Sequence, residues 1–406
     1  MNDRVLVIGA SHAGVHLAAS LREKGHTGSL TLVGAEPHLP YHRPPLSKAY
    51  LSGTPMAEPV ALRPESFYDA KNITLLRGER VDKIDLAAGV AVTSAGVDLG
   101  FDHLALATGA RARRLKLPGD DLDGLIYLRN LDNARRLLRR LDSVRRVVVV
   151  GGGFIGLEAA AVLRERHINV TLVEAGDRLM ARSVSQEMSD YVLDVHRARG
   201  TRILLGTGVT AFEGTDGDLT SVTLADGSSV PADLVVIGIG VTPRTELAEQ
   251  IGLTVDNGII VDCHARTDDP RVVAVGDVTV VPHPLEPGTR LRLESVQNAT
   301  DQAAAAATSI LGQDPSPVSV PWFWSDQFDL KLQMAGASSK YDDIVIRGSV
   351  AKGRFTVLCY RGDRLVAGEC VNSGADFGAL RRALAGGISF RRDHAADESI
   401  TLKALL

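Results

Sequence analysis

The sequence predicts an α/β fold in which one parallel strand-helix-strand unit occurs twice and a smaller α+β domain follows. Residues 5–8 are a continuous apolar run, residues 9–14 are a turn with glycine at each end, and residues 15–24 have the apolar spacing of a helix. Residues 30–33 then supply a second apolar strand. The same order recurs over residues 147–173, offset by 142 positions. Because parallel strands joined by a crossover helix define Rossmann-like domains, we predict two dinucleotide-binding domains of that kind.

Length and composition agree with this fold and exclude several functions. A chain of 406 residues exceeds what one hydrophobic core usually supports, so we expect two or three domains. It has 40 glycines and only 4% aromatic residues, a balance typical of α/β proteins with many tight turns. The net charge of −4 argues against a nucleic-acid partner. No apolar run reaches about 18 residues, and the first strand begins near the N-terminus, so we expect no membrane span, no signal peptide and a cytoplasmic location.

Three further apolar segments, each with a glycine at or next to its end, predict how the domains alternate along the chain. Residues 104–109 close the first domain, residues 234–240 close the second, and residues 272–277 return a strand to the first, which is therefore discontinuous. Alternating apolar runs within residues 344–371 predict an antiparallel sheet in the last domain, with a helix over residues 377–384. The predicted domains are residues 1–110 with 242–319, residues 111–241, and residues 320–406.

The first glycine turn has the features of a dinucleotide site. Gly9 and Gly14 let a pyrophosphate approach the helix N-terminus, whereas Ser11 replaces the usual middle glycine and weakens the match. A glycine turn without a cofactor is the alternative. Two carboxylates favour a flavin dinucleotide, namely Glu36 after the second strand for the ribose and Asp277 at a strand end for the ribityl chain. The structural alternatives are a solvated loop acid at Glu36 and a helix N-cap at Asp277.

The second glycine turn is the stronger match. Its full fingerprint consists of Gly151, Gly153 and Gly156. Glu174 follows at the spacing of an acid that binds a ribose 2′-hydroxyl and would repel the extra phosphate of NADPH, so we predict a preference for NADH. Arg178 and Arg182 leave an alternative, because either could bind that phosphate. A flavin held against a nicotinamide is the simplest reason for two such sites, so the pair indicates hydride transfer.

The cysteines narrow the choice of electron acceptor. Cys263, Cys359 and Cys370 form no CxxC or CxxxxC pair, and residues 41–45 contain no cysteine where related flavoproteins carry a single catalytic one. Disulfide-reductase chemistry and a zinc site are therefore disfavoured, and we predict no bound metal. An external one-electron acceptor is the option that remains.

Five stretches of the chain resemble one known family. They are residues 41–48, 107–109, 153–158, 274–277 and 321–327, of which the first (YHRPPLSK) and the last (PWFWSDQ) are the most specific. Together they resemble the NADH-dependent ferredoxin reductases, FAD flavoproteins of the type of putidaredoxin reductase and biphenyl dioxygenase ferredoxin reductase. The resemblance implies an NADH:ferredoxin oxidoreductase that passes electrons via FAD, one at a time, to a [2Fe-2S] ferredoxin serving a cytochrome P450 or an aromatic-ring dioxygenase.

The residues and the resemblance together predict the site. The predicted FAD-binding residues are Gly9, Ser11, Ala13, Gly14, Ala35, Glu36, Lys48, Val81, Thr108, Gly109, Arg129, Gly276, Asp277 and Val296, with Ala35 departing from an acid often found there. The predicted NADH-binding residues are Gly151, Gly153, Ile155, Gly156, Glu174, Arg182 and Gly240. The resemblance implies a catalytic ion pair of Lys48 and Glu158 beside the flavin, with Trp324 covering the ring. The alternatives are a structural ion pair and a core tryptophan.

The expected partner is an acidic ferredoxin, with an oxygenase as an indirect partner and the chain itself a monomer or weak dimer. Candidate docking residues are Arg290, Arg292, Arg381, Arg382, Arg391 and Arg392, although merely solvated arginines are the alternative. Three other functions stay open at this point: a rubredoxin reductase, an NADH oxidase-type flavoprotein, and a non-enzymatic binding protein resembling apoptosis-inducing factor.

Overall fold

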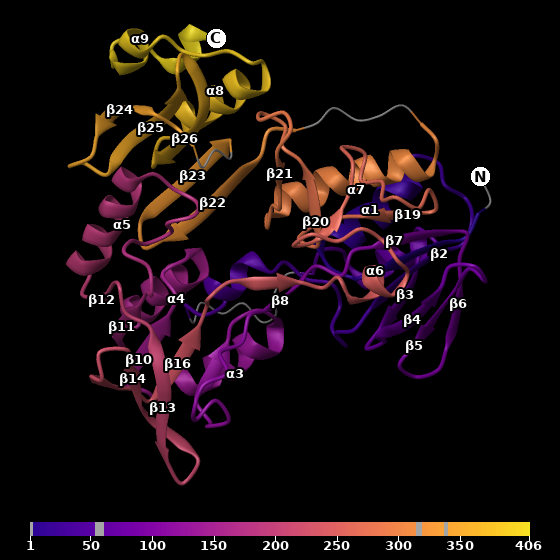
Figure 1. Ribbon diagram of the computed structural model, residues 1–406, viewed down its shortest axis with the longest axis horizontal. Helices are drawn as coiled ribbons and strands as arrows, with labels where there is room; N and C mark the ends of the chain where they lie inside the picture. The colour runs from indigo at the N-terminus through magenta and orange to yellow at the C-terminus, as the bar shows by residue number, and fades with distance from the viewer. Residues whose placement is uncertain (1–2, 53–60, 314–318, 337–339) are drawn as a thin grey trace. The chain divides into compact units, whose positions relative to one another are not determined.

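The computed structural model describes residues 3–52, 61–313, 319–336 and 340–406, and its chain forms two compact units (Figure 1). Unit 1 comprises Met1–His42, Val60–Arg111 and Thr242–Pro321. Unit 2 comprises Arg43–Pro59, Ala112–Val241 and Trp322–Leu406. Two short strands, β8 (Ala110–Ala112) and β17 (Val241–Pro243), lie where the chain passes from one unit to the other. The domain boundaries stated above stay a prediction.

Unit 1 is built around a parallel sheet of five strands in the order β19-β7-β1-β2-β3. Its elements are β1 (Val5–Ile8), α1 (His12–Glu23), β2 (Leu30–Gly34), α2 (Glu65–Ala70), β3 (Thr74–Arg77), β4 (Val81–Asp85), β5 (Val90–Thr93), β6 (Asp98–Gly100), β7 (His103–Leu106), α6 (Glu246–Gln250), β18 (Ile259–Ile260), β19 (Val272–Ala274), β20 (Thr279–Pro282), β21 (Arg290–Leu291) and α7 (Val296–Ile310). The late strand β19 pairs with β7, as residues 272–277 predicted.

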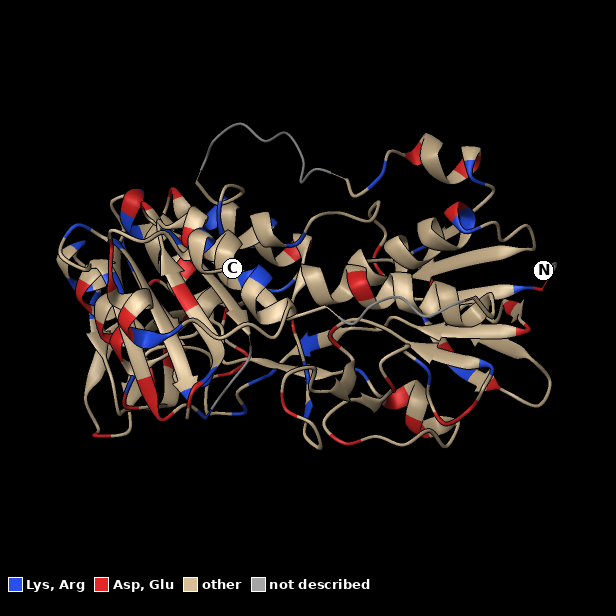
Figure 2. Cartoon of the chain, turned by 90° about the horizontal axis from the view of Figure 1, so that it is seen from above, with Lys and Arg blue, Asp and Glu red and all other residues tan. Residues whose placement is uncertain are grey.

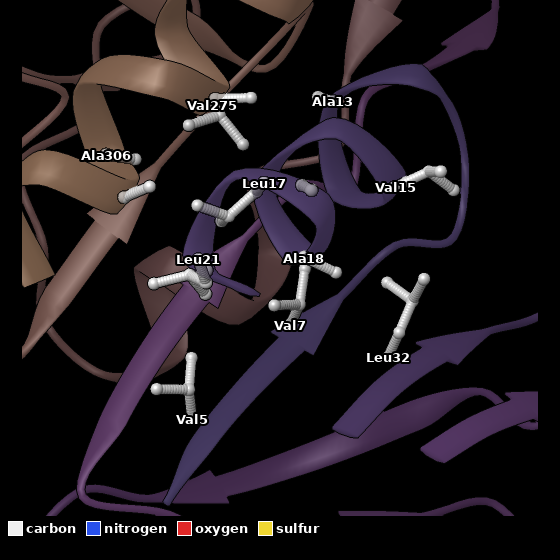
Figure 3. Packing of buried hydrophobic residues seen from close by; sticks show 14 of the residues in the cluster. Val5, Val7, Ala13, Val15, Leu17, Ala18, Leu21, Leu32, Val275 and Ala306 are labelled. Atoms are coloured by element: carbon white, nitrogen blue, oxygen red, sulfur yellow. The ribbon is translucent and has the colours of Figure 1, made fainter. Parts of the chain in front are cut away.

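The core of unit 1 lies between its sheet and α1. Leu17 and Leu21 of α1 are fully buried and pack with Val5 and Val7 of β1 in one cluster of apolar side chains (Figure 3). Each such side chain contributes about 1.5–3 kcal/mol when buried. This packing fixes α1 against β1, the two elements that the glycine turn joins.

Unit 2 contains a second parallel sheet, in the order β12-β11-β10-β16-β9, and an antiparallel sheet in the order β22-β23-β26-β25-β24. Its elements before residue 240 are η1 (Pro44–Ser47), β9 (Leu125–Tyr127), α3 (Leu131–Leu141), β10 (Arg146–Val150), α4 (Phe154–Glu165), β11 (Asn169–Val173), α5 (Gln186–Ala198), β12 (Arg202–Leu204), β13 (Val209–Thr215), β14 (Asp218–Leu224), β15 (Ser229–Pro231) and β16 (Leu234–Ile237). Its later elements are β22 (Trp322–Gln327), β23 (Leu330–Gly336), β24 (Asp343–Ser349), β25 (Arg354–Arg361), β26 (Arg364–Val371), α8 (Gly374–Ala385), α9 (Arg392–Ala396) and η2 (Leu402–Leu405).

The predicted α/β class and the antiparallel sheet near the C-terminus are confirmed. Helix α1 begins at His12, three residues before the predicted start at residue 15, because the end of the glycine turn already belongs to the helix. Within the described ranges, no helix combines the length and the apolar character needed to cross a bilayer. Acidic and basic side chains are interspersed along the elements (Figure 2).

Candidate functional site

The turn between β1 and α1 needs glycine at both ends. Gly9 has φ +119°, and a Cβ there would lie 2.1 Å from the Ala107 carbonyl oxygen. A Cβ at Gly14 would lie 1.9 Å from the Gly9 carbonyl oxygen. A Cβ at Gly276, which has φ +84°, would come within 2.9 Å of the Ala13 Cβ. The ends of β1, β7 and β19 therefore meet closely at the N-terminus of α1, which is the place where such folds hold a pyrophosphate.

Hydrogen bonds hold Glu36 itself and the turn that carries Asp277, the two predicted acids of unit 1. Glu36 is half-buried and accepts a 2.6 Å hydrogen bond from the Tyr41 hydroxyl, so it is not a purely solvated loop acid. The turn that carries Asp277 is tied to α7, because Gln302 Oε1 accepts from the Gly276 N–H at 2.6 Å and from the Thr279 hydroxyl at 2.9 Å. Both carboxylates are thus held at the carboxyl ends of parallel strands.

The other predicted FAD-binding residues are divided between the units. Ser11 is the N-cap of α1, Val296 is the first residue of α7, and Val81 is buried at the start of β4, all in unit 1. The Thr108 hydroxyl of unit 1 donates to the Arg244 carbonyl at 2.8 Å, next to Gly109 with φ +63°; Ala35 of the same unit is exposed. Lys48 and Arg129 belong to unit 2, where the Arg129 carbonyl accepts from Arg43 at 3.2 Å. Their contact with FAD stays a prediction.

The turn between β10 and α4 places different demands on the three glycines of the fingerprint. A Cβ at Gly151, with φ +108°, would lie 2.5 Å from the Gly238 carbonyl oxygen, and a Cβ at Gly156 would lie 2.0 Å from the Gly151 carbonyl oxygen. Gly153 has an ordinary φ of −84°, and a Cβ there would meet no described atom within 4 Å. The chain's own packing therefore demands glycine at two positions and leaves open space at the third.

That open space lies at an uncapped helix N-terminus. Helices α3, α5 and α7 each begin with a side chain that accepts from the backbone, namely Asn130, Ser185 and Ser295. Helix α4 has Gly153 as its N-cap residue and no side-chain cap, so its first N–H groups are available to an anion. A pyrophosphate is negatively charged and accepts hydrogen bonds, so it matches the free N–H groups and the open space at this helix N-terminus. The residues present therefore fit a dinucleotide.

Glu174 is anchored at the end of β11. Its two carboxylate oxygens accept from the Gly152 N–H at 2.6 Å and from the Gly176 N–H at 2.7 Å, and each oxygen keeps a further lone pair. The Arg182 guanidinium is exposed, and its Nη2 would lie 3.6 Å from a Cβ at Gly240. Ile155, the second residue of α4, is 42% exposed although it is apolar.

Arg178, the other arginine considered for a 2′-phosphate, is engaged inside the chain. Its guanidinium donates to the carbonyl oxygens of Ala181 at 2.6 Å, Val184 at 2.9 Å and Ser185 at 3.3 Å. Arg178 therefore supports the loop before α5, whereas the Arg182 guanidinium is exposed and makes no hydrogen bond or ion pair with the described residues.

Lys48 and Glu158, both of unit 2, form an ion pair, and its place beside the flavin stays a prediction. Lys48 Nζ lies 2.9 Å from Glu158 Oε1, with 18% of the Lys48 side chain and 2% of the Glu158 side chain exposed. Two hydroxyls complete the surroundings of the carboxylate, Ser47 at 2.5 Å from Oε2 and Ser325 at 2.7 Å from Oε1. The buried negative charge is thus met by one ammonium and two hydroxyl donors.

Sequence reasoning missed Ser47 and Ser325 as partners of Glu158. Both residues stand inside the two most specific stretches, Ser47 next to Lys48 and Ser325 next to Trp324. A polar residue at a buried position of each stretch was the available signal. What the sequence did not show is that both hydroxyls converge on one carboxylate.

Trp324 belongs to an aromatic group on β22. Its ring centroid is 6.2 Å from that of Phe323 and 5.6 Å from that of Trp322, and Phe323 contacts Phe154 of α4 at 4.7 Å. Trp324 is half-buried, so it is neither a core tryptophan nor a fully exposed one. Its position over the flavin stays a prediction.

Two of the three cysteines are buried in the antiparallel sheet. Cys359 and Cys370 are buried on β25 and β26, and burial raises the pKa of the Cys370 thiol to about 12. Cys263 is exposed in unit 1. In the described part of the chain, no group of three or more His, Cys, Asp and Glu side chains is arranged to hold a metal ion.

Comparisons with known proteins identify the class. Residues 3–303 match the family described as pyridine nucleotide-disulphide oxidoreductase, and residues 322–406 match the one described as reductase C-terminal. Rhodocoxin reductase of Rhodococcus erythropolis is 46% identical over 399 residues, covering 98% of this chain and 93% of that protein. Putidaredoxin reductase CamA of Pseudomonas putida is 40% identical over 410 residues, covering 100% and 97%.

Solved structures agree with these relatives. The ferredoxin reductase for the CYP199A2 system from Rhodopseudomonas palustris has a TM-score of 0.95 at 42% identity and covers 99% of each chain. Putidaredoxin reductase in its covalent complex with putidaredoxin has a TM-score of 0.95 at 39% identity, covering 100% of this chain and 98% of that one. The chain belongs to the pyridine nucleotide-disulphide oxidoreductase family. Within it, the chain is one of the ferredoxin reductases that use FAD and a nicotinamide dinucleotide.

Proposed function

We propose that this chain is an FAD-dependent NADH:ferredoxin oxidoreductase whose electron acceptor is a [2Fe-2S] ferredoxin. One observation carries the proposal: the open, uncapped start of α4 at Gly153 and the buried ion pair at Glu158 lie on the same helix, little more than one turn apart. A bound flavin accepts a hydride and releases its two electrons singly. The similarity to ferredoxin reductases over the whole chain supports the same conclusion.

The chain's own residues have distinct duties in this proposal. Gly9, Ser11 and Gly14 would hold the FAD pyrophosphate at the start of α1, with Glu36 at the ribose and Asp277 at the ribityl chain. Each duty follows from a carboxylate or a helix N-terminus that the fold keeps at the end of a parallel strand.

The ion pair would act on charge and orientation. Lys48, at the end of η1, supplies a positive charge. Its ion pair with Glu158 of α4 keeps the ammonium in place. The Ser47 and Ser325 hydroxyls hold the carboxylate, so its orientation does not depend on Lys48 alone. A carboxylate held in one orientation can in turn fix the amide of a bound nicotinamide.

The nicotinamide specificity rests on Glu174. Two backbone N–H groups fix its carboxylate oxygens, which would present a negative charge to a ligand at the end of β11. A 2′-phosphate would be repelled there, whereas a ribose hydroxyl could donate to the remaining lone pairs. The engagement of Arg178 with three carbonyls weakens the alternative of an NADPH site.

The acceptor follows from the relatives and from charge. One solved relative is a covalent complex with putidaredoxin, and another relative is the anthranilate 1,2-dioxygenase system ferredoxin--NAD(+) reductase component of Burkholderia cepacia, 40% identical over 405 residues. These names support a ferredoxin that serves a cytochrome P450 or a ring dioxygenase. A second candidate is a rubredoxin, because the rubredoxin-NAD(+) reductase of Pseudomonas putida is 38% identical over 376 residues. A cytoplasmic location agrees with three free cysteines.

The test is an anaerobic titration of the purified, flavin-loaded protein. NADH should bleach the flavin absorbance in a stoichiometric reaction, and a [2Fe-2S] ferredoxin added afterwards should then be reduced. A rubredoxin added in parallel tests the second candidate. Fast oxygen consumption without any reduction of either protein would contradict the proposal and favour an oxidase, and negligible flavin reduction by NADH would favour a binding protein.

A further inference from the structure

A line of buried polar side chains leads from Glu158 away from Lys48 to helix α5. The Ser325 hydroxyl lies 2.7 Å from Glu158 Oε1, Gln327 Nε2 lies 3.1 Å from the Ser325 hydroxyl, and His196 Nε2 lies 3.0 Å from Gln327 Oε1. His196 and Ser325 are 0% exposed and Gln327 is 1% exposed. Because water has no access, each of these groups depends on its neighbour in the line.

The fold brings the line together from three elements of unit 2. Ser325 and Gln327 are two residues apart on β22, so their side chains point to the same face of the strand. Phe323 shares that face and contacts Phe154, which lies one helical turn before Glu158 on α4. His196 comes from the last turn of α5. One face of β22 therefore lies along α4 and ends at α5.

The chemistry of the groups sets a single direction along the line. The Glu158 carboxylate, paired with the Lys48 ammonium, can only accept, so the Ser325 hydroxyl donates to it. The Ser325 oxygen then accepts from the Gln327 amide N–H, which leaves Gln327 Oε1 facing His196. An amide oxygen can only accept, so His196 must carry its proton on Nε2.

The other ring nitrogen of His196 agrees with this assignment. Its Nδ1 atom is buried and has no hydrogen-bond partner among the residues that the structure describes. A ring protonated at Nδ1 would leave that N–H unpaired, at a cost that an unprotonated nitrogen avoids. Burial also lowers the pKa of His196 to about 4, so the ring is neutral near pH 7. All donors in the line therefore point toward Glu158.

We propose that His196 and Gln327 are positioning residues that act through Ser325 to hold the Glu158 carboxylate in the orientation in which it meets Lys48. This inference rests on the proposed function, because it assigns the two residues a duty in the reaction with NADH. Bonds aligned in one direction strengthen one another, so the last donor, Ser325, binds Glu158 more firmly than an isolated hydroxyl would. Without His196 the Gln327 amide can turn over, and Ser325 then loses the donor that orients it.

The first test does not use the reaction. Long-range proton–nitrogen NMR on nitrogen-15-labelled holoprotein reports the tautomer of each histidine, and His196→Gln identifies the His196 signal by its loss. We expect a neutral ring with its proton on Nε2 at neutral pH, and a shift of that signal in Gln327→Met and in Glu158→Gln. A ring with its proton on Nδ1 would overturn the inference, because Gln327 would then have to donate to His196 and the line would break.

The second test separates positioning from mere stability. In stopped flow, His196→Leu and Gln327→Met should lower the limiting rate of flavin reduction at saturating NADH by about five- to twentyfold, with the NADH concentration for half-saturation and the FAD content unchanged. His196→Gln keeps an N–H donor and should restore most of the rate. An unchanged rate in both line variants, with only a lower melting temperature, would overturn the inference.

A control variant distinguishes loss of positioning from the general effect of removing a buried histidine. His26 is a buried histidine of unit 1 outside the line, and His26→Leu should leave the limiting rate unchanged. If His26→Leu slowed the reaction as much as His196→Leu, the effect would be a general loss of a buried histidine. Failure of the proposed function itself is recognised separately, because then the unmutated protein would not be reduced by NADH at all.

Discussion

Lys48 Nζ and Glu158 Oε1 lie 2.9 Å apart, and Glu158 is nearly completely buried. The two residues are far apart in the sequence. Lys48 follows the short helix η1, and Glu158 lies on α4, the helix that begins at the second glycine turn. The pair therefore ties the end of η1 to the helix that begins at the second glycine turn.

Removal of the ammonium should damage both the reaction and the fold. Lys48→Ala leaves the buried Glu158 charge with two hydroxyl donors only, so we expect a destabilisation of about 3–5 kcal/mol and a limiting rate of flavin reduction at least about tenfold lower. Denaturant unfolding and stopped-flow absorbance check the two effects. Lys48→Arg, which keeps a positive charge, is the control and should retain most of the stability. A fully active Lys48→Ala would show that the pair is structural.

The glycines of the second turn should separate binding from folding. Gly153→Ala places its Cβ in open space, so the melting temperature should hardly change, while the dissociation constant for NADH should rise by about tenfold or more because a Cβ intrudes where the pyrophosphate approaches. Gly156→Ala puts a Cβ 2.0 Å from the Gly151 carbonyl oxygen and should cost several kcal/mol of stability. Calorimetry of binding and thermal unfolding distinguish the two. Normal NADH binding by Gly153→Ala would remove this turn from the site.

Glu174 should set the choice of nicotinamide. Glu174→Gln removes the negative charge and keeps one acceptor oxygen, while its amide nitrogen replaces one of the two oxygens that accept from backbone N–H groups. Because the charge is lost, the ratio of kcat/KM for NADPH to that for NADH should rise by about tenfold or more. Arg178→Ala is the matched control: it breaks hydrogen bonds to three carbonyls and should lower stability without changing the ratio. An unmutated protein that uses both coenzymes equally well would contradict the assignment of Glu174.

Histidine burial predicts a pH dependence of stability. The pKa of His196 falls from 6.5 to about 4 on folding because its ring is desolvated. Between these values the unfolded chain binds a proton that the folded chain does not, so this contribution to stability is complete above pH 6.5 and decreases as the pH falls toward 4, by about 3 kcal/mol in total. Glu369 gives the opposite slope, since burial raises its pKa to about 7. The slope must therefore be compared with that of His196→Gln, which should lack the His196 part; equal slopes would contradict the prediction.

Ferredoxin docking should depend on particular arginines. Arg391 is paired with Asp393 at 2.7 Å, Arg392 with Asp343 at 2.8 Å, whereas Arg381 is exposed and lies over the Trp322 ring, 4.7 Å from its centroid. We expect Arg381→Ala to lower the second-order rate of ferredoxin reduction by about threefold or more at low salt, and the loss to shrink as salt is added. Arg391→Ala is the control, because Asp393 already cancels most of its field. A rate that is insensitive to salt would exclude steering by these charges.

Much of the fold was predictable because its signals are local. Apolar runs of strand length, a helical repeat and the glycines between them lie within a few residues of one another, so residues 5–33 and 147–173 showed both parallel units, and the alternation after residue 344 showed the antiparallel sheet. The start of α1 was placed too late, because the last residues of the glycine turn already belong to the helix but carry no apolar spacing. The ion pair of Lys48 and Glu158 came from a resemblance, since no spacing relates the two residues.

The sequence by itself determined that this chain has two dinucleotide-binding folds, an acid at the end of β11, and no cysteine pair for disulfide chemistry, because glycine conformations and residue spacings act over short distances. Only the tertiary structure decided what surrounds Glu158. Ser47, Ser325, Gln327 and His196 come from segments far apart in the chain. Their roles depend on burial, which forces each polar group to find a partner inside the protein, and burial is a property of the packed molecule rather than of any stretch of sequence.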